Sequence, residues 1–391
     1  MTEFRQPRLE EFVPLAVPNV GPAEAANLQA CIDTTFVSTV GAFVGEFERG
    51  VAELSGAAEG VAMGAGTLAL HMSLHGLGVG RGDLVVLPSF TFIASANSVR
   101  HTGADPWLFD VAEDWTLDPQ QVADALARDT HRAGDDLIHT PTGRRVAALM
   151  PVYTLGTPAD MEALGALAED YGLPIVADAA AAIGVTYKGE AIGGLADLTC
   201  YSFNGNKTIT SGGGGMVVGN DTERLARIRH ISTTARVSTD YEHDEVGYNY
   251  RMTNLQAAVG VAQLGRLPEF LDTKRRIRAR YDVAFGDVAG ISPFPYPGDR
   301  ESACWFSGLV LDEGHPMSAA EVCAALQARN IQARVFWKPV HLQAPYADAP
   351  RESMTRSENT YRRIVTLPCS TLLTDEVQDR VISDVVDILT R

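Results

Sequence analysis

From about residue 58 to residue 265, short apolar runs alternate with stretches of helical periodicity. The apolar runs are LVVLPSFTFIA, PWLFDV, RVAALMPVY, LPIVADAA, DLTCYSF and GGMVVG, and the helical stretches include PQQVADALAR and PADMEALGALAEDYG. Wholly apolar strands separated by helices are typical of a mostly parallel sheet covered on both faces. The sequence therefore predicts an α/β fold, in which ligands gather at the carboxyl ends of the strands.

The rest of the chain predicts a second, smaller domain, because 391 residues exceed the length at which one core usually stops growing. A basic helix, LPEFLDTKRRIRARYDVAF, is predicted from residue 267, followed by CWFSGLVL, SAAEVCAALQARN, IQARVFWKPVHLQ and the helix TDEVQDRVISDVVDILTR. We predict a large domain over 1–266 and a small C-terminal α/β domain over 267–391. The polar stretch 128–145 predicts a surface excursion.

Charge and composition exclude several classes of protein. The net charge of −17 argues against a nucleic-acid polymer as partner. No apolar run reaches the roughly 18 residues that span a bilayer, and MTEFRQPRLEEF has no signal-peptide core. The five cysteines are widely spread and form no CxxC pair, which argues against a zinc knuckle or a disulfide framework. We therefore expect a cytoplasmic protein that does not bind membranes.

Two histidines raise the question of a metal site. His71 and His75 are spaced i, i+4 on a predicted helix, a spacing that can hold a metal ion. In the sequence no nearby carboxylate or third histidine completes such a site. We therefore predict no metal.

Lys207 and Asp178 together indicate pyridoxal phosphate (PLP) chemistry. Lys207 lies between a strand-like run and the glycine cluster SGGGG, and Asp178 ends the strand-like run LPIVAD. A lysine can form a Schiff base with PLP once its pKa is lowered, and an acid can hold the protonated pyridine nitrogen. Judged locally, Asp178 can equally cap the segment that follows it. The pair predicts a PLP enzyme.

A phosphate site is predicted further upstream. In MGAGTLALHMSL, Gly64 and Gly66 permit a tight turn, and we expect Thr67 to be the N-cap of the helix that follows. The N–H groups at such a helix start bind anions. Ser202 and the glycines at 212–215 are expected to let the backbone approach the cofactor. Phe92 is expected either to stack on the ring or to lie in the core.

Six segments at regular spacing carry a family resemblance: FVSTVGAFVGEFE, GAGTLALHMSL, PSFTFIASANSV, ADAAAAIG, SFNGNKTITSGGGGMVV and GYNYRMTNLQAA. Over nearly its whole length the chain resembles the DegT/DnrJ/EryC1/StrS family of PLP-dependent nucleotide-sugar aminotransferases. The resemblance implies PLP fold type I, with a mostly parallel large domain and a smaller C-terminal domain. It also implies a homodimer with active sites shared between subunits, and L-glutamate as amino donor.

The resemblance assigns roles to residues of this chain. Lys207 corresponds to the Schiff-base lysine, Asp178 to the partner of the pyridine nitrogen, and Phe92 to the aromatic that stacks on the ring. The implied phosphate contacts are Gly66, Thr67, the amide of Leu68, the hydroxyl of Ser202 and, from the other subunit, Asn249. Cations for the diphosphate of the substrate are expected among Arg251, Arg334, Lys338 and His341.

Three positions depart from the family pattern. Ala181 stands where many members have Gln or His, Gly213 where many have Glu, and Tyr153 where many have His. With the motifs NGNKTITSGGGG and TGRRVAALMPV, these departures resemble the subgroup that aminates C4 of UDP-linked 4-keto-6-deoxy-N-acetylhexosamines for surface glycans. The prediction is thus a nucleotide-sugar aminotransferase with a preference for UDP.

Three alternatives stay open. The chain could aminate C3 of a deoxysugar or a cyclitol. It could be a sugar dehydratase of the same family, against which Lys207 argues, because those members typically carry histidine there. It could also be a PLP-binding regulator without turnover.

Overall fold

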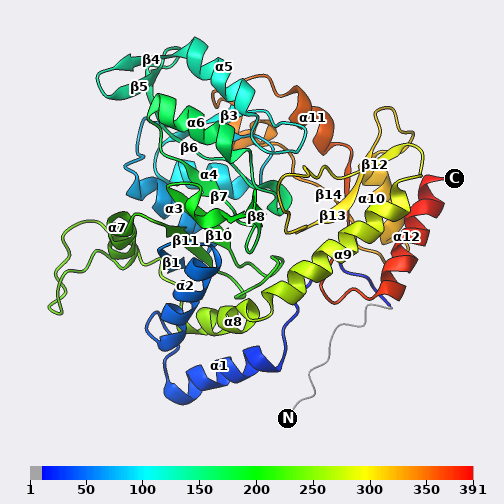
Figure 1. Ribbon diagram of the computed structural model, residues 1–391, viewed down its shortest axis with the longest axis horizontal. Helices are drawn as coiled ribbons and strands as arrows, with labels where there is room; N and C mark the ends of the chain where they lie inside the picture. The colour runs from blue at the N-terminus through cyan, green and yellow to red at the C-terminus, as the bar shows by residue number, and fades with distance from the viewer. Residues whose placement is uncertain (1–10, 391) are drawn as a thin grey trace.

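The computed structural model describes residues 11–390, and its larger part is a sheet set between helices (Figure 1). One run of strands has the order β1-β11-β10-β7 and another the order β3-β2-β6-β5-β4. Parallel bridges from Leu149 to Ile175 and from Val152 to Asp178 join them. The bounds are β1 Glu59–Met63, β2 Leu84–Pro88, β3 Asp105–Phe109, β4 Thr130–Ala133, β5 Asp136–His139, β6 Arg144–Leu149, β7 Val176–Asp178, β10 Leu198–Ser202 and β11 Gly215–Gly219.

The strands β10, β7, β6, β2 and β3 run parallel to one another, as predicted. The pairs β2–β3, β2–β6 and β7–β10 are parallel, whereas β11 runs antiparallel to both β1 and β10. Successive side chains of β2 enter different cores: Leu84 and Val86 pack on one face, Val85 and Leu87 on the other. Burial on both faces explains why these strands read as unbroken apolar runs.

Helices cover both faces of the sheet (Figure 1). Their bounds are α1 Pro22–Thr34, α2 Ala42–Leu54, α3 Gly66–Gly76, α4 Ile93–His101, α5 Pro119–Asp129, α6 Met161–Tyr171, α7 Thr222–Ser232 and α8 Asn254–Leu264. Short elements complete this part: β8 Thr186–Tyr187, β9 Glu190–Ala191, and the 3-10 turns Thr154–Gly156 and Ile192–Gly194. Among residues 11–390, no helix is long and apolar enough to cross a membrane.

The helix α9, Leu267–Phe285, leads into a smaller unit with its own antiparallel sheet of order β12-β13-β15-β14. The N-terminal segment joins this unit, because Val13 forms a parallel bridge with Ile331 and is buried in the same core. Both ends of the chain therefore build the small unit. Its other elements are β12 Ile291–Pro293, β13 Ser307–Leu311, α10 Ala319–Gln327, β14 Arg334–Val335, α11 Thr355–Tyr361, β15 Ile364–Leu367, α12 Asp375–Leu389, and the 3-10 turns Val340–Leu342 and Ala344–Tyr346.

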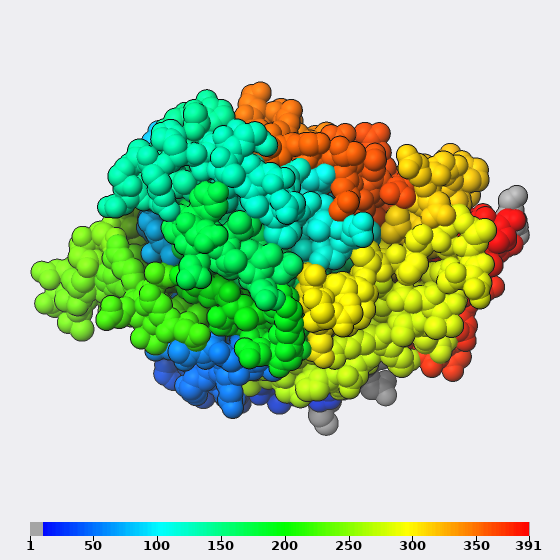
Figure 2. All heavy atoms as spheres, turned by 45° about the horizontal axis from the view of Figure 1, so that its top comes forward, coloured from blue at the N-terminus to red at the C-terminus, as the bar shows by residue number. Residues whose placement is uncertain are grey.

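Several details differ from the sequence-based expectations. The run LVVLPSFTFIA is not one strand: β2 ends at Pro88, and the chain turns into α4 with Phe92 as N-cap. The excursion 128–145 contains the hairpin β4–β5, which extends the sheet beside β6. Most of MTEFRQPRLEEF lies outside the described residues. A long segment after α7, residues 233–248, projects from the body of the molecule (Figures 1 and 2).

Candidate functional site

A cavity of about 490 Å³ lies where the carboxyl ends of β7 and β10 meet the N-termini of α3 and α4 and the small unit. Ligands of parallel sheets commonly bind at these carboxyl ends of the strands. The predicted site residues that line it are Gly66, Thr67, Phe92, Asp178, Ala181, Ser202, Lys207 and Arg334. The fold thus brings together eight residues that are spread over most of the sequence.

Asp178, the last residue of β7, places a carboxylate at the floor of this cavity. It is 5% exposed and accepts hydrogen bonds from the Ser95 hydroxyl at 2.7 Å and from the main-chain N–H of Ala180 at 3.1 Å. Burial raises the pKa of Asp178, and these two hydrogen bonds and the charge of Lys207 oppose that rise. The hydrogen bond from the Ala180 N–H shows that Asp178 also caps the segment that follows it. A buried carboxylate in this setting is a strong acceptor for a cationic ring N–H.

Lys207 follows β10 and reaches the same cavity. Burial lowers its pKa to about 8, although the negative charge of Asp178 works in the opposite direction. The side chain is half-buried and lines the cavity. A lysine with this pKa supplies some neutral amine at neutral pH, and a neutral amine is what attack on an aldehyde requires.

The predicted phosphate site lies at the start of α3. The N-cap is Ala65 rather than the expected Thr67, which sits inside the first turn, so the helix begins without a side-chain cap. A Cβ on Gly66 would lie 2.8 Å from Cβ of Ser202, and one on Gly215 would lie 2.6 Å from the Ala65 oxygen. Glycine at both positions lets β10 and β11 close tightly on the helix start.

The main-chain N–H groups of this first turn point toward the N-terminal end, where an anion binds. The Leu68 N–H also donates to the Ala65 oxygen at 3.1 Å, and the Leu68 side chain packs away from the cavity. Gly66 and Thr67 line the cavity directly, with Ser202 opposite them. This cradle has the size and polarity for a phosphate group.

Phe92 lies at the cavity wall with 54% of its side chain exposed, so the reading as a core residue is wrong. Its ring centre is 6.2 Å from that of Trp337. Ala181 is buried and also lines the cavity. An exposed aromatic face and a small residue in one cavity are suited to a flat ring.

Besides Leu68, four predicted residues do not line the cavity within this chain. Arg251 is paired with Glu48 at 2.6 Å. His341 is 7% exposed, with Nδ1 at 2.6 Å from the Ser89 hydroxyl and Nε2 at 3.1 Å from Glu358. The remaining two, Asn249 and Lys338, are exposed. Of the four predicted diphosphate-binding residues, only Arg334 is at the cavity of its own chain.

The argument against a metal at His71 needs correction, because a third histidine does lie nearby. The ring of His101 is 5.7 Å from that of His71, and the ring of His75 is 6.2 Å away. The sequence could not show this, since His101 comes from the neighbouring helix α4. Burial and the two other histidines lower the pKa of His71 to about 4.

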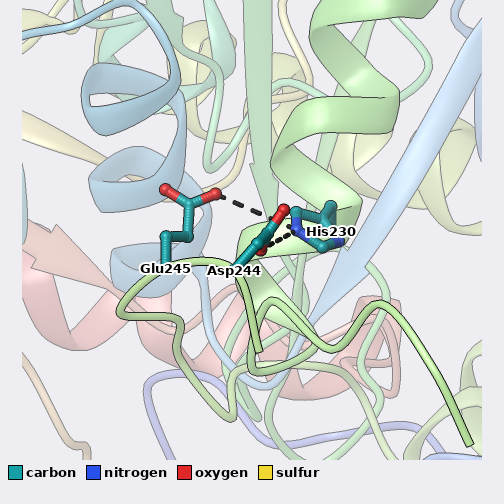
Figure 3. A group of neighbouring side chains, drawn as sticks. All are labelled: His230, Asp244 and Glu245. Atoms are coloured by element: carbon teal, nitrogen blue, oxygen red, sulfur yellow. Dashed lines mark hydrogen bonds and ion pairs between the residues drawn. The ribbon is translucent and has the colours of Figure 1, made fainter. Parts of the chain in front are cut away.

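Within residues 11–390, one group of three ligand-type side chains comes within 4.8 Å: His230, Asp244 and Glu245 (Figure 3). His230 lies 2.8 Å from Asp244, and Arg227 forms an ion pair with Glu245. Arg227 thus balances the charge of Glu245, and the His230 ring lies within hydrogen-bond distance of Asp244. The group fastens the projecting segment 233–248 to α7.

Several residues of the cavity escaped the sequence-based site prediction, among them Ser95, Tyr153 and Trp305. The Tyr153 hydroxyl is buried and has no hydrogen-bond partner among the described residues, so it is available to a ligand. Trp305 touches Lys207 across 98 positions of sequence, as its ring centre lies 3.6 Å from the lysine nitrogen. No local pattern marks such a contact. Tyr153 alone had a signal, as a departure from the family pattern.

A buried acid, a lysine of lowered pKa, an aromatic wall and a phosphate cradle in one cavity together fit PLP. The donor set matches each part of that molecule: ring nitrogen, aldehyde, ring face and phosphate.

Comparison with known proteins agrees. The model of the DegT/DnrJ/EryC1/StrS aminotransferase family matches residues 18–386. The chain is 34% identical to GDP-perosamine synthase of Caulobacter vibrioides, covering 96% of this chain and 98% of that protein. It is 33% identical to EpsN of Bacillus subtilis, whose name describes a pyridoxal phosphate-dependent aminotransferase, over 94% of this chain and 93% of that one.

Solved structures of aminotransferases have a similar fold. The structure of DesI in the presence of its TDP-sugar product superposes with a TM-score of 0.87 at 27% identity, covering 97% of this chain and 94% of that one. The α/β architecture is therefore PLP fold type I, and the enzyme is a PLP-dependent sugar aminotransferase. The chain belongs to the DegT/DnrJ/EryC1/StrS aminotransferase family.

Proposed function

We propose that this enzyme transfers the amino group of L-glutamate to a nucleotide-linked 4-keto-6-deoxy sugar, giving a 4-amino sugar for glycan synthesis. The observation that carries the proposal is the convergence of Lys207, Asp178 and the Gly66–Ser202 cradle on one cavity. These residues would hold PLP by its ring nitrogen, its aldehyde and its phosphate. The rest of the cavity is where an amino donor and a keto sugar would enter in turn.

PLP, when bound, supplies the electron sink for the reaction. Asp178 holds the ring nitrogen in its protonated form through its buried carboxylate. Lys207 carries the cofactor and, once free, moves a proton at the substrate carbon. A positioned acid–base group contributes about 10²–10⁴-fold in rate.

The nucleotide and the sugar are the finer part of the proposal. The sequence favours a UDP-linked N-acetylhexosamine derivative, whereas the Caulobacter relative makes a GDP-linked sugar. Arg334, exposed at the cavity rim, is placed to contact the diphosphate in either case. A panel of UDP-, GDP- and TDP-linked keto sugars, assayed for glutamate-dependent amination, distinguishes these acceptors.

We also propose that the enzyme works as a homodimer. The projecting segment 233–248 carries Val237, Tyr241 and Val246 with 54%, 76% and 87% of their side chains exposed. Apolar side chains exposed on such an arm favour burial against a partner. Asn249, at its base, is exposed and does not line the cavity of its own chain, which suits a contact with the cofactor phosphate of the other subunit.

The first experiment is an absorbance spectrum of the protein with PLP, before and after L-glutamate, for the wild type and Lys207→Ala. We expect a visible band that glutamate bleaches and that the variant lacks. Lys207→Ala turning over at a near wild-type rate would contradict the assignment of Lys207. A band that glutamate leaves unchanged would retain PLP binding and contradict glutamate as donor. That result would also return the dehydratase alternative to consideration.

A further inference from the structure

Trp305 links the small unit to the loop that carries Lys207. Its indole N–H donates a hydrogen bond to the main-chain oxygen of Asn206, with 2.6 Å between nitrogen and oxygen. The side-chain nitrogen of Lys207 lies over the same indole, 3.6 Å from the ring centre. Through its edge this one residue fixes the loop, and through its face it contacts the lysine.

Trp305 is itself held from several sides. The side chain is 3% exposed, and its ring centre lies 4.2 Å from that of Phe306 and 5.8 Å from that of Trp337. Its main-chain oxygen accepts a hydrogen bond from the buried Lys274 of α9 at 2.9 Å. Lys274 also donates to the Cys369 oxygen at 2.6 Å, which ties two segments of the small unit together. A side chain locked in this way holds its neighbours to one geometry.

We propose that Trp305 is a positioning residue whose indole face holds the amine of Lys207 within the cavity whenever that amine is not bonded to PLP. The inference rests on the proposed function, in which Lys207 alternates between carrying the cofactor and acting as a free amine. Tryptophan offers the best aromatic face for a cation. The contact therefore retains the freed lysine beside its reaction partner and favours its ammonium form.

Three effects then set the charge of Lys207. Burial lowers its pKa to about 8, and the negative charge of Asp178 works against that fall. The indole face also stabilises the charged form. A simple truncation of Trp305 would mix them, because removal of the ring also admits water. Fluorination separates them, since it weakens the ring's negative face while keeping its shape and its N–H group.

The experiment uses the PLP-free protein with tryptophan, 5-fluorotryptophan or 5,7-difluorotryptophan inserted at position 305. Reductive methylation of Lys207 is followed against pH by peptide mass spectrometry. We expect the labelling midpoint to fall with each fluorine, by roughly half a pH unit across the series, or about threefold more label at pH 7. The same substitutions at Trp337, whose ring does not contact Lys207, are the matched control and should leave the midpoint in place.

A second set of variants tests the edge of the ring in the PLP-loaded protein. Trp305→Phe keeps an aromatic face and removes the N–H, whereas Trp305→Leu removes both. After glutamate is washed out and PLP is supplied, the visible band should return about tenfold more slowly in Trp305→Leu, with Trp305→Phe between it and the wild type. Equal recovery rates in all three proteins would contradict the role of Trp305.

The outcomes separate this inference from the proposed function. Borohydride reduction of the wild-type protein with PLP should fix the cofactor on Lys207. If it does, and fluorination at position 305 leaves the midpoint unchanged, the positioning role alone is wrong. If borohydride fixes no cofactor on Lys207, both proposals fall.

Discussion

Asp178 keeps a carboxylate inside the protein with neutral hydrogen-bond donors, the Ser95 hydroxyl and the Ala180 N–H. Neutral donors compensate only part of the cost of burying a charge. The raised pKa of Asp178 expresses the remainder. The Asp178 carboxylate is therefore only partly compensated by the protein's own groups, Lys207 included, and a ring N–H cation would complete the compensation.

This balance predicts opposite effects of Asp178→Asn on the empty and the loaded protein. Without PLP the variant should be as stable as the wild type or more stable by about 1 kcal/mol, because a buried charge is removed. With PLP, affinity should fall at least tenfold, since a hydrogen bond to a charged group contributes about 1.5–3 kcal/mol. Thermal unfolding without PLP and absorbance titration with it provide the two measurements. Unchanged PLP affinity would argue against a contact between Asp178 and the ring nitrogen.

The site residues that could be predicted from the sequence are those marked by the residues adjacent to them in the chain. Asp178 ends an apolar strand and Lys207 precedes a glycine cluster, so both were found by local pattern. Ser95 and Trp305 were missed because their contacts with these two span 83 and 98 positions. Arg251 was expected near the substrate, but its ion pair with Glu48 is a tertiary contact that no spacing indicates.

Among the elements of the site, the start of α3 leaves little room for any added side-chain atom. A Cβ on Gly66 would meet Ser202 at 2.8 Å, whereas one on Gly64 would meet Leu68 no closer than 3.7 Å. Gly66→Ala should therefore push α3 away from β10, costing about 1–3 kcal/mol in stability and weakening PLP binding. Gly64→Ala is the matched control and should bind PLP normally. Equal PLP affinities for the two variants would refute this account of the cradle.

The same helix carries a titratable group that the reaction does not use. His71 is 2% exposed and lies among His75, His101, Tyr248 and Tyr250. Its pKa is lowered to about 4 in the folded protein, against about 6.5 in an unfolded chain. The unfolded state then binds more protons between these values, so stability should fall as pH drops from 6.5 toward 4.

Replacement of His71 by phenylalanine tests whether this histidine makes stability fall at low pH. The wild type should lose about 1 kcal/mol of unfolding free energy between pH 7.5 and pH 5 through this group, after allowance for partial solvent screening. His71→Phe should show a correspondingly flatter pH dependence in urea unfolding. An identical dependence in both proteins would mean that His71 is not the group responsible.

Element boundaries show where sequence reasoning works and where it stops. The helix α9 occupies the predicted span because its apolar face and first-turn proline are local signals. The start of α4 was missed since SFTFIA is apolar and β-prone, while the residues that bury it lie elsewhere in the chain. The N-cap of α3 was expected at Thr67 but lies two residues earlier, at Ala65, because this helix begins without a side-chain cap.

For the whole molecule, the proposed dimer makes a prediction about mixed subunits. Lys207→Ala and Asn249→Ala should each be inactive or impaired, because they damage the two halves of a shared site. Co-expressed in equal amounts, they should recover about a quarter of wild-type activity, since half of the dimers would contain one intact site of two. Recovery no greater than the sum of the two separate variants would show that each site is built from one subunit.

The walls of the cavity run from Leu15, near one end of the chain, to Thr366 in β15, near the other. Synthesis proceeds from the N-terminus, and the last stretch of a nascent chain is still within the ribosome when the rest has emerged. The large sheet can therefore form while translation continues, but the pocket is closed only after the small unit has left the exit tunnel. Vitamin B6 capture should accordingly follow chain release, and a stalled nascent chain should bind the vitamin poorly even when its lysine is already outside the ribosome.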